Sequence, residues 1–464
     1  ARYNQPLYVA VKTRQQVAAA EGKVTVDFYL INEKNVRGNH QLKISVTDYQ
    51  GKVMEVGTYE TEAAGGEVYG QLLVKDVKIP VPTAGGLCRI EAKLCKENSV
   101  VTTGYDDILS VNLASNMLDG KGAVWEDGSA LQNFLKGKTK EAVAAYEDNL
   151  GKLDWIMVAR PPKKDQLTMV PMEALRSADG KPGLDVVYYE DMEFQKEVYH
   201  EVAKVVNLSA IEGATPSPFV YMLDGYGIKW SGKLLPSVSG EYTIIPQSND
   251  RSMIEVFVNG KKIYEITRKK EHLGDGKVYL EGGKSADIEI RFRHPRSNAR
   301  CRLDWAVPND KMPDAQRLME RAVNDGTKIF IIQSADEWSE FIAANSKVVF
   351  KDKFFVGTNW LGGVMFNKPH DIFKELPVGN ALNWPYQALI HTGVERMGLV
   401  MEGEELLVGA YHTYPMAIGT AMGIVPMGKG SVLFSTLDIY GNIINDSAAG
   451  LVAKKLIFNM IDFK

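Results

Sequence analysis

The stretch that decides the fold runs Gly240-Glu241-Tyr242-Thr243-Ile244-Ile245-Pro246-Gln247-Ser248-Asn249-Asp250-Arg251-Ser252-Met253-Ile254-Glu255-Val256-Phe257-Val258-Asn259-Gly260-Lys261. Apolar and polar residues alternate in 240–246 and again in 253–258, with the period of two that is typical of half-buried strands. The dipeptide Asn259-Gly260 favours a tight hairpin turn. Similar alternation follows at 277–280 and 286–292. The pattern predicts an antiparallel β-domain over residues 184–307.

The first 113 residues are also rich in strand patterns. Short runs of Val, Ile, Leu and Tyr, such as 23–31 and 70–79, are separated by Gly, Asn, Asp and Pro. About seven short strands with regular turn signals indicate a β-sandwich of immunoglobulin type over residues 1–113. Cys88 and Cys95 lie in one strand run on opposite sides, so we expect buried free thiols and no bridge between them.

The remaining segments, 114–183 and 308–464, alternate helices and strands, which is typical of an α/β domain with a parallel sheet. A helical pattern covers Asp314–Asn324 and Gly326 fits its C-cap. Leu451, Lys455 and Phe458 mark the two faces of the last, amphipathic helix. The economical account is one α/β domain, interrupted by the β-domain at 184–307. The predicted elements are helices at 129–135, 138–153, 314–324, 336–343 and 448–461, and strands at 123–125, 154–159, 328–332 and 431–436.

Composition narrows the class of protein further. A chain of 464 residues has room for about three domains. The 54 basic and 58 acidic side chains leave a formal net charge of -4, which argues against a nucleic-acid partner. Apolar runs are far too short for a membrane span. Three cysteines exclude a disulfide scaffold and none has zinc spacing.

The β-domain at 184–307 carries the most specific resemblance. The run 228–236, the loop Ser248–Ser252, the hairpin at 256–261 and the closing Arg302-Leu303-Asp304-Trp305 occur in an order that resembles the lectin-like module first named from protective antigen. Several members of that family bind sugars, and the module often occurs as an insertion in glycosidases.

This resemblance also implies a binding site. In sugar-binding members, an Asp-Asp pair and a downstream Asn or Asp hold a calcium ion that contacts sugar hydroxyls. The matching positions are Asn249, Asp250 and Asn259, so the resemblance implies Ca²⁺ as a cofactor; no other cofactor or metal site is expected. Asn249 removes one charge from the set of oxygen ligands that calcium prefers. The alternative is that Asn249-Asp250 forms a turn between strands.

The flanking segments resemble a second family. Pro6–Lys12 and Val24–Lys34 look like the sandwich that follows the catalytic barrel in family 2 glycoside hydrolases of the β-galactosidase type. The runs 359–363, 383–387 and 428–432 resemble the flavodoxin-like or amidotransferase-like C-terminal domain of the same large bacterial enzymes. The resemblance implies the C-terminal part of a glycosidase that degrades polysaccharides in the periplasm, outside the cell or at its surface. The start at Ala1, without Met or a signal segment, fits a piece of a larger product.

Catalytic residues are not expected in this chain. Asn32-Glu33 matches the acid/base dipeptide of a retaining glycosidase, but a catalytic barrel needs about 250 residues, so the paired carboxylates and the barrel would lie upstream. An amidotransferase needs a Cys nucleophile, and 114–183 and 308–464 contain no cysteine. Gly430-Ser431 continues directly into a strand, which does not match a serine elbow.

Three aromatic residues suggest a cleft that binds sugar. Trp360, Trp384 and Tyr386 occur among Gly, Asn and Pro, which is typical of exposed loops whose rings can stack on sugar faces. The alternative is that these rings pin their loops to the α/β core.

The leading hypothesis is a non-catalytic accessory region that binds a poly- or oligosaccharide and packs against the upstream barrel. Two other hypotheses stay open: a stand-alone amidotransferase- or peptidase-like hydrolase, and a carbohydrate-binding surface adhesin.

Overall fold

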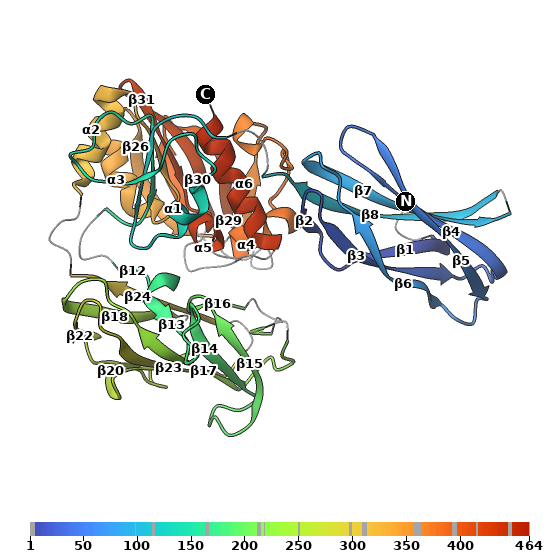
Figure 1. Cartoon of the computed structure of the whole chain (residues 1–464), viewed down its shortest axis with the longest axis horizontal. Helices are drawn as coiled ribbons and strands as arrows, with labels where there is room; N and C mark the ends of the chain where they lie inside the picture. Colours follow the sequence, from blue (N-terminus) through green and yellow to red (C-terminus); the bar gives the residue numbers. More distant parts are fainter. Residues whose placement is uncertain are drawn as a thin grey trace. The chain divides into compact units, whose positions relative to one another are not determined.

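The computed structural model describes residues 5–97, 99–113, 117–162, 167–210, 215–217, 219–248, 251–296, 299–308, 313–356, 363–391, 397–413, 416–443 and 448–463. The chain forms two compact units, of which the first is Ala1–Asn116 with Lys368–Tyr386 and Asn445–Lys464, and the second is Met117–Asn367 with Gln387–Ile444. Figure 1 shows their elements along the chain. No helix in the described ranges is both long and apolar enough to cross a bilayer.

The first unit contains two sheets that share one core. A three-stranded sheet has the order β1-β3-β6 and a five-stranded sheet the order β2-β8-β7-β4-β5. Val24, Phe28 and Leu30 pack with Leu42 and Ile90 from the other sheet in one buried cluster, which makes this part a β-sandwich. The strands are β1 (Leu7–Thr13), β2 (Val17–Ala19), β3 (Lys23–Asn32), β4 (Arg37–Thr47), β5 (Val53–Ala64), β6 (Gly70–Pro80), β7 (Gly86–Lys96) and β8 (Ser99–Val111).

The cysteines behave as the sequence predicts. Cys88, Cys95 and Cys301 are free and buried, and burial raises the pKa of the Cys88 thiol to about 11. At neutral pH that thiol therefore stays protonated and unreactive.

The last helix belongs to the first unit, and the environment of one of its residues, Lys455, differs from the prediction. α6 (Ala448–Asp462) lies next to β2, β8 and the short 3-10 turns η3 (Asp371–Phe373) and η4 (Trp384–Tyr386). Lys455 does not lie on a solvated face but is buried, and its ammonium donates to Glu375 at 2.6 Å and to the Asn112 carbonyl at 3.2 Å. Leu451 and Lys455 are four residues apart and therefore lie on the same side of the helix, so they do not mark two different faces. The contacts that bury Lys455 come from distant parts of the sequence.

A ten-stranded mixed sheet dominates one part of the second unit. Its parallel half has the order β10-β9-β11-β25-β31, and antiparallel strands continue from β31. The strands are β9 (Gly122–Glu126), β10 (Ala144–Ala145), β11 (Trp155–Ala159), β25 (Lys328–Ile331), β26 (Val349–Phe355), β27 (Gly363–Asn367), β28 (Met397–Glu402), β29 (Glu405–Thr413), β30 (Met416–Met427) and β31 (Gly430–Ser435).

The helices beside this sheet are α1 (Ala130–Leu135), α2 (Ala315–Asp325), α3 (Ala335–Ala344), α4 (Gln387–His391) and α5 (Ile439–Ile443). The C-terminal end of α2 confirms the prediction, because Gly326 is the C-cap and adopts a φ of 79°. Asp314, predicted as the first helical residue, is the N-cap, and its side chain accepts the N–H groups of Gln316 and Arg317. The helix predicted at 138–153 is wrong. Only the two-residue strand β10 forms there, and Arg321 of α2 binds the carbonyls of Asp148, Leu150 and Gly151. Ala144 and Ala145 pair with Ala123 and Val124 of β9, and the Tyr146 N–H donates to the Val124 carbonyl. The backbone in the middle of the segment therefore bonds to the sheet and does not form helical turns.

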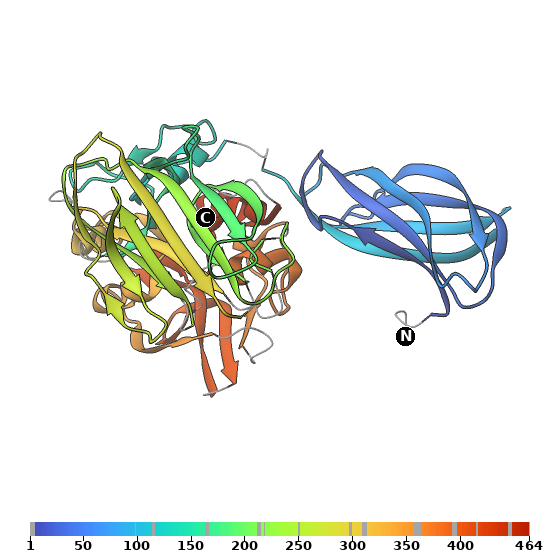
Figure 2. The ribbon, with the colours of Figure 1, turned by 90° about the horizontal axis from the view of Figure 1, so that it is seen from below.

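The remaining part of the second unit is a sandwich of a five-stranded and an eight-stranded sheet around one apolar core. The first has the order β12-β24-β18-β22, with β16 also on β24. The second has the order β15-β14-β17-β23-β19-β20-β21, with β13 on β17. Figure 2 shows strands of the eight-stranded sheet, in green to yellow, side by side. Pairing of β12 and β13 means that the sandwich includes residues before the predicted boundary at 184.

The strands of this sandwich are β12 (Thr168–Met169), β13 (Leu175–Arg176), β14 (Leu184–Tyr189), β15 (Glu197–Ala203), β16 (Asn207–Ser209), β17 (Tyr226–Leu234), β18 (Gly240–Ser248), β19 (Met253–Val258), β20 (Lys261–Ile266), β21 (His272–Leu273), β22 (Lys277–Leu280), β23 (Ala286–His294) and β24 (Arg300–Ala306), with the 3-10 turn η1 (Met172–Ala174) before β13. The predicted hairpin is confirmed: Asn259 and Gly260 have φ angles of 49° and 75°, as a turn with two left-handed residues requires.

Candidate functional site

The candidate site lies on the outer face of the eight-stranded sheet. Alternation along β17, β23 and β19 sends residues such as Trp230, Ile290 and Val256 into the core and sends the next residues outward. The register places outward residues in rows across the three strands. One row is Ser231, Glu289 and Phe257; the next is Lys229, Arg291 and Glu255; the third is Gly227, Arg293 and Met253.

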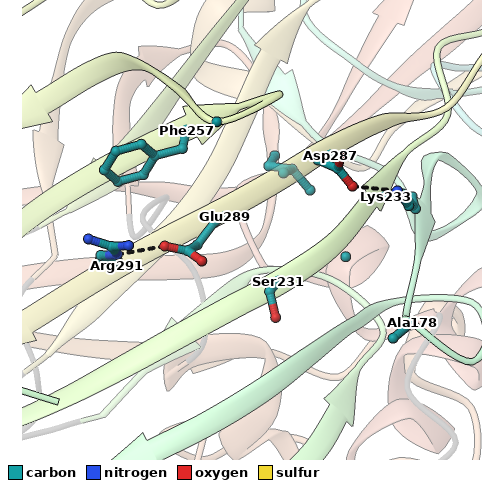
Figure 3. Close-up of a pocket in the computed structure, with 10 residues that line it drawn as sticks. Ala178, Ser231, Lys233, Phe257, Asp287, Glu289 and Arg291 are labelled. Atoms are coloured by element: carbon teal, nitrogen blue, oxygen red, sulfur yellow. Dashed lines mark hydrogen bonds and ion pairs between the residues drawn. The ribbon is translucent and has the colours of Figure 1, made fainter. Parts of the chain in front are cut away.

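The first row forms the floor of what we call the Phe257 hollow. The hollow has a volume of about 550 Å³, and its lining includes Ser231, Lys233, Phe257, Asp287, Glu289 and Arg291. Figure 3 shows Arg291 and Glu289 joined by an ion pair beside the Phe257 ring, with Lys233 and Asp287 joined in the same way.

The charges in the Phe257 hollow balance one another. Arg291 lies 2.6 Å from Glu289 and its guanidinium carbon lies 4.8 Å from the centre of the Phe257 ring. Lys233 pairs with Asp287 across the two strands. Donors and acceptors are therefore offered in pairs beside an aromatic ring, without a net charge. This chemistry suits a molecule with many hydroxyl groups, and none of the described lining residues is a Cys or His nucleophile or base.

Glycine keeps one wall of the hollow close to the sheet. A Cβ on Gly232 would lie 2.2 Å from the carbonyl oxygen of Arg176. Only glycine therefore allows β13 to pair with β17 at this point, and that pairing brings the neighbouring turn with Ala178 to the rim of the hollow.

A second depression, the Arg293 hollow, lies farther along the same face. It has a volume of about 640 Å³, and its lining includes Glu193, Arg251, Arg268, Lys270 and Arg293. Arg293 and Arg291 are two residues apart on β23, so their side chains emerge on the same face about 7 Å apart.

Arg293 is held from three sides. Its Nη1 lies 3.0 Å from a Glu255 carboxylate oxygen, its Nε donates to the Met192 carbonyl at 3.1 Å, and its guanidinium lies 4.7 Å from the centre of the Phe194 ring. Although burial raises the pKa of Glu255, hydrogen bonds from Arg293 and Lys262 hold it below its ordinary value. Glu255 therefore stays ionised and fixes the guanidinium.

Of the three predicted calcium residues, the structure describes only Asn259. Asn249 and Asp250 lie outside the described residues. The Asn259 side chain accepts a hydrogen bond from the Asp287 N–H at 2.8 Å, which holds it at the hairpin between β19 and β20. A calcium site that includes Asn249 and Asp250 stays a prediction. The described residues contain no group of three or more His, Cys, Asp or Glu placed to hold a metal.

The predicted cleft aromatics are only partly described. Trp360 lies outside the described residues, and Trp384 is half-buried in η4. Tyr386 is only 2% exposed, its hydroxyl donates to the Pro377 carbonyl at 2.6 Å, and its ring packs edge-on against Phe373. The Tyr386 ring therefore has no free face for a sugar, and it packs against Phe373 within the first unit.

Sequence reasoning missed a polar cluster where the parallel strands end. The Glu126 carboxylate accepts the N–H groups of Leu131 and Gln132 and the Tyr440 hydroxyl, all at 2.8–3.0 Å. Next to Glu126 in the chain, Asp127 binds Arg160 at 2.6 Å. Polar residues directly after buried strands were the available signal, but only the fold brings Tyr440 to Glu126. Protein groups occupy both Glu126 oxygens, so this carboxylate anchors α1 and Tyr440.

Comparison with known proteins identifies part of the chain. Residues 180–317 match the model of the PA14 domain, which confirms the predicted protective-antigen-type module. One curated protein, the anti-sigma-I factor RsgI3 of Acetivibrio thermocellus, is 27% identical over 127 residues. The match covers 27% of this chain, and the chain spans only about a fifth (19%) of that relative's length.

Solved structures give distant similarities. A β-glucosidase from Kluyveromyces marxianus is 13% identical, with 49% of this chain and 30% of that chain covered and a TM-score of 0.33. An anti-sigma factor domain-containing protein from Clostridium clariflavum is 10% identical, with 66% and 90% covered and a TM-score of 0.27. The epithelial adhesin 9 A domain from Candida glabrata, in complex with Galβ1-3GlcNAc, is 13% identical, with 32% and 89% covered and a TM-score of 0.23. Scores this low carry no argument about function.

Proposed function

We propose that the chain is a non-catalytic carbohydrate-binding region, and that the Phe257 hollow of its PA14 sandwich holds an uncharged part of a poly- or oligosaccharide. The observation that carries the proposal is the pairing of Arg291 with Glu289 and of Lys233 with Asp287 around the Phe257 ring. Paired charges can donate to and accept from neighbouring sugar hydroxyls, and a ring edge or face covers the apolar side of a sugar.

The proposal extends to a longer protein of which this chain would be one part. The region would serve a family 2-like glycoside hydrolase with an upstream catalytic barrel, working in the periplasm or outside the cell. The strand order β10-β9-β11-β25-β31 supports a flavodoxin-like α/β domain, because these strands follow the order 2-1-3-4-5 in the chain. The domain plan of a sandwich followed by a split α/β domain belongs to this proposal. The Ca²⁺ site at Asn249 and Asp250 belongs to it as well. Titration of Ca²⁺ into the wild type and into Asp250→Ala would test that site.

A glycan screen of the whole 464-residue chain, followed by calorimetry with the best ligand, tests the binding proposal. Phe257→Ala removes the ring of the hollow, and Tyr279→Ala is the matched control because it removes an exposed ring from β22 of the other sheet. We expect Phe257→Ala to weaken binding about fivefold or more, the effect of about 1 kcal/mol of lost ring contact, and Tyr279→Ala to leave it unchanged. Absence of any glycan ligand, or equal binding by wild type and Phe257→Ala, would reject the proposal.

A further inference from the structure

We propose that the Arg293 hollow binds an anionic group of the glycan, a carboxylate or a sulfate. The inference rests on the proposed function, because it names the class of carbohydrate that the outer face selects: an acidic polysaccharide whose uncharged part lies over the Phe257 hollow.

The charge of the lining carries the inference. Arg251, Arg268, Lys270 and Arg293 line the hollow, against one carboxylate, that of Glu193. Arg251 and Arg268 are exposed. Glu255 offsets the charge of Arg293, so the described lining keeps a positive excess that the chain as a whole, with its net charge of -4, does not have.

One of the cations, Arg293, is also held in place before a ligand arrives. Asp191 accepts the backbone N–H groups of Glu193, Gln195 and Lys196, which fixes the loop at the rim of the hollow. Phe194 in that loop lies against Arg293. A guanidinium held in place loses little freedom on binding, and its planar donors match the oxygens of a carboxylate or sulfate.

The Phe257 hollow and the Arg293 hollow differ in net charge, as a glycan that alternates neutral and acidic sugars would require. Arg291 is neutralised by Glu289 in the Phe257 hollow, whereas the Arg293 hollow has more cations than acids. The two lie along β23 on one face. One glycan chain can therefore place a neutral sugar over Phe257 and an acidic sugar near Arg251 and Arg268.

Binding of matched acidic and neutral probes to the whole chain tests the inference. Trigalacturonate is compared with its methyl ester for the carboxylate, and dextran sulfate with dextran for the sulfate. The variant is Arg251→Gln with Arg268→Gln, both at exposed positions. The control is Lys277→Gln with Lys284→Gln, which removes two exposed cations that pair with Glu241 and Glu281 elsewhere on the sandwich.

We expect at least one acidic probe to bind about tenfold more tightly than its neutral partner. The Arg251/Arg268 variant should lose that tenfold and the lysine control should keep it, and salt raised from about 0.05 M to about 0.5 M should abolish the difference. Equal binding of acidic and neutral probes, or loss of selectivity in the lysine control alone, would overturn the inference while leaving the proposed function in place. If no glycan binds at all, the proposed function itself fails.

Discussion

Single residues in this chain carry roles that their neighbours in sequence do not reveal. Asn259 matches a calcium position by resemblance, but its left-handed backbone and its hydrogen bond to Asp287 make it the residue that closes a hairpin. Arg293 has no motif around it, yet three contacts hold it at a hollow. For both Asn259 and Arg293, contacts with residues elsewhere in the chain determine the role.

The first prediction concerns Asn259. Asn259→Ala should lower the free energy of unfolding of the sandwich by about 1–2 kcal/mol, because alanine tolerates a positive φ poorly and cannot accept the Asp287 N–H. Asn259→Gly keeps the backbone conformation and should cost less. Thermal unfolding of the three proteins measures the effect. Equal midpoints, together with a lower affinity for Ca²⁺ in Asn259→Ala, would instead support the ligand role.

The second prediction concerns Glu126. Burial raises the pKa of its carboxyl, and the bonds from Gln132, Leu131 and Tyr440 oppose this only partly. A carboxyl with a raised pKa binds its proton more tightly in the folded state, so its stabilising contribution is present at low pH and is lost as pH rises above the ordinary glutamate value. The stability of wild type relative to Glu126→Gln should therefore fall as the pH rises above the ordinary glutamate pKa of about 4.3. Urea unfolding of both proteins measures this, and parallel stability profiles would contradict it.

At the scale of elements, the sequence predicted correctly those helices whose ends depend only on nearby residues. Helical spacing and the C-cap at Gly326 located α2, because both signals are local in the chain. The prediction of a helix at 138–153 was wrong because Ala144 and Ala145 pair with β9 and Arg321, from a distant part of the sequence, holds the carbonyls of the segment's end. Lys455 is buried for a similar reason, since Glu375 and Asn112 approach it only in the folded chain.

The third prediction concerns Arg321. Arg321→Ala should destabilise the second unit by about 2 kcal/mol or more, because three carbonyls and the Tyr146 hydroxyl lose a charged donor. Backbone amides in 146–151 should exchange hydrogen faster, as mass spectrometry can measure. Arg317→Ala is the control, because that side chain is exposed on the same helix. Unchanged exchange in Arg321→Ala would show that the segment holds its shape without these bonds.

At the scale of the whole molecule, the sequence predicted the lectin-like module but not its candidate site. The hairpin, the alternating strands and the order of motifs identified the module, since each is local or linear in the chain. The two hollows depend on which strands pair and in what register: Phe257, Glu289 and Ser231 come from three strands. Neither the balanced charge near Phe257 nor the positive excess near Arg293 is visible before the register is known.

The central claim is that the outer face of the eight-stranded sheet holds a glycan, and a structure of the chain with a bound oligosaccharide tests it most directly. The account predicts a sugar ring against Phe257, with its hydroxyls within hydrogen-bond distance of Glu289, Arg291 or Lys233. A sugar bound only to the five-stranded sheet or to the first unit, with the Phe257 hollow empty, would contradict it.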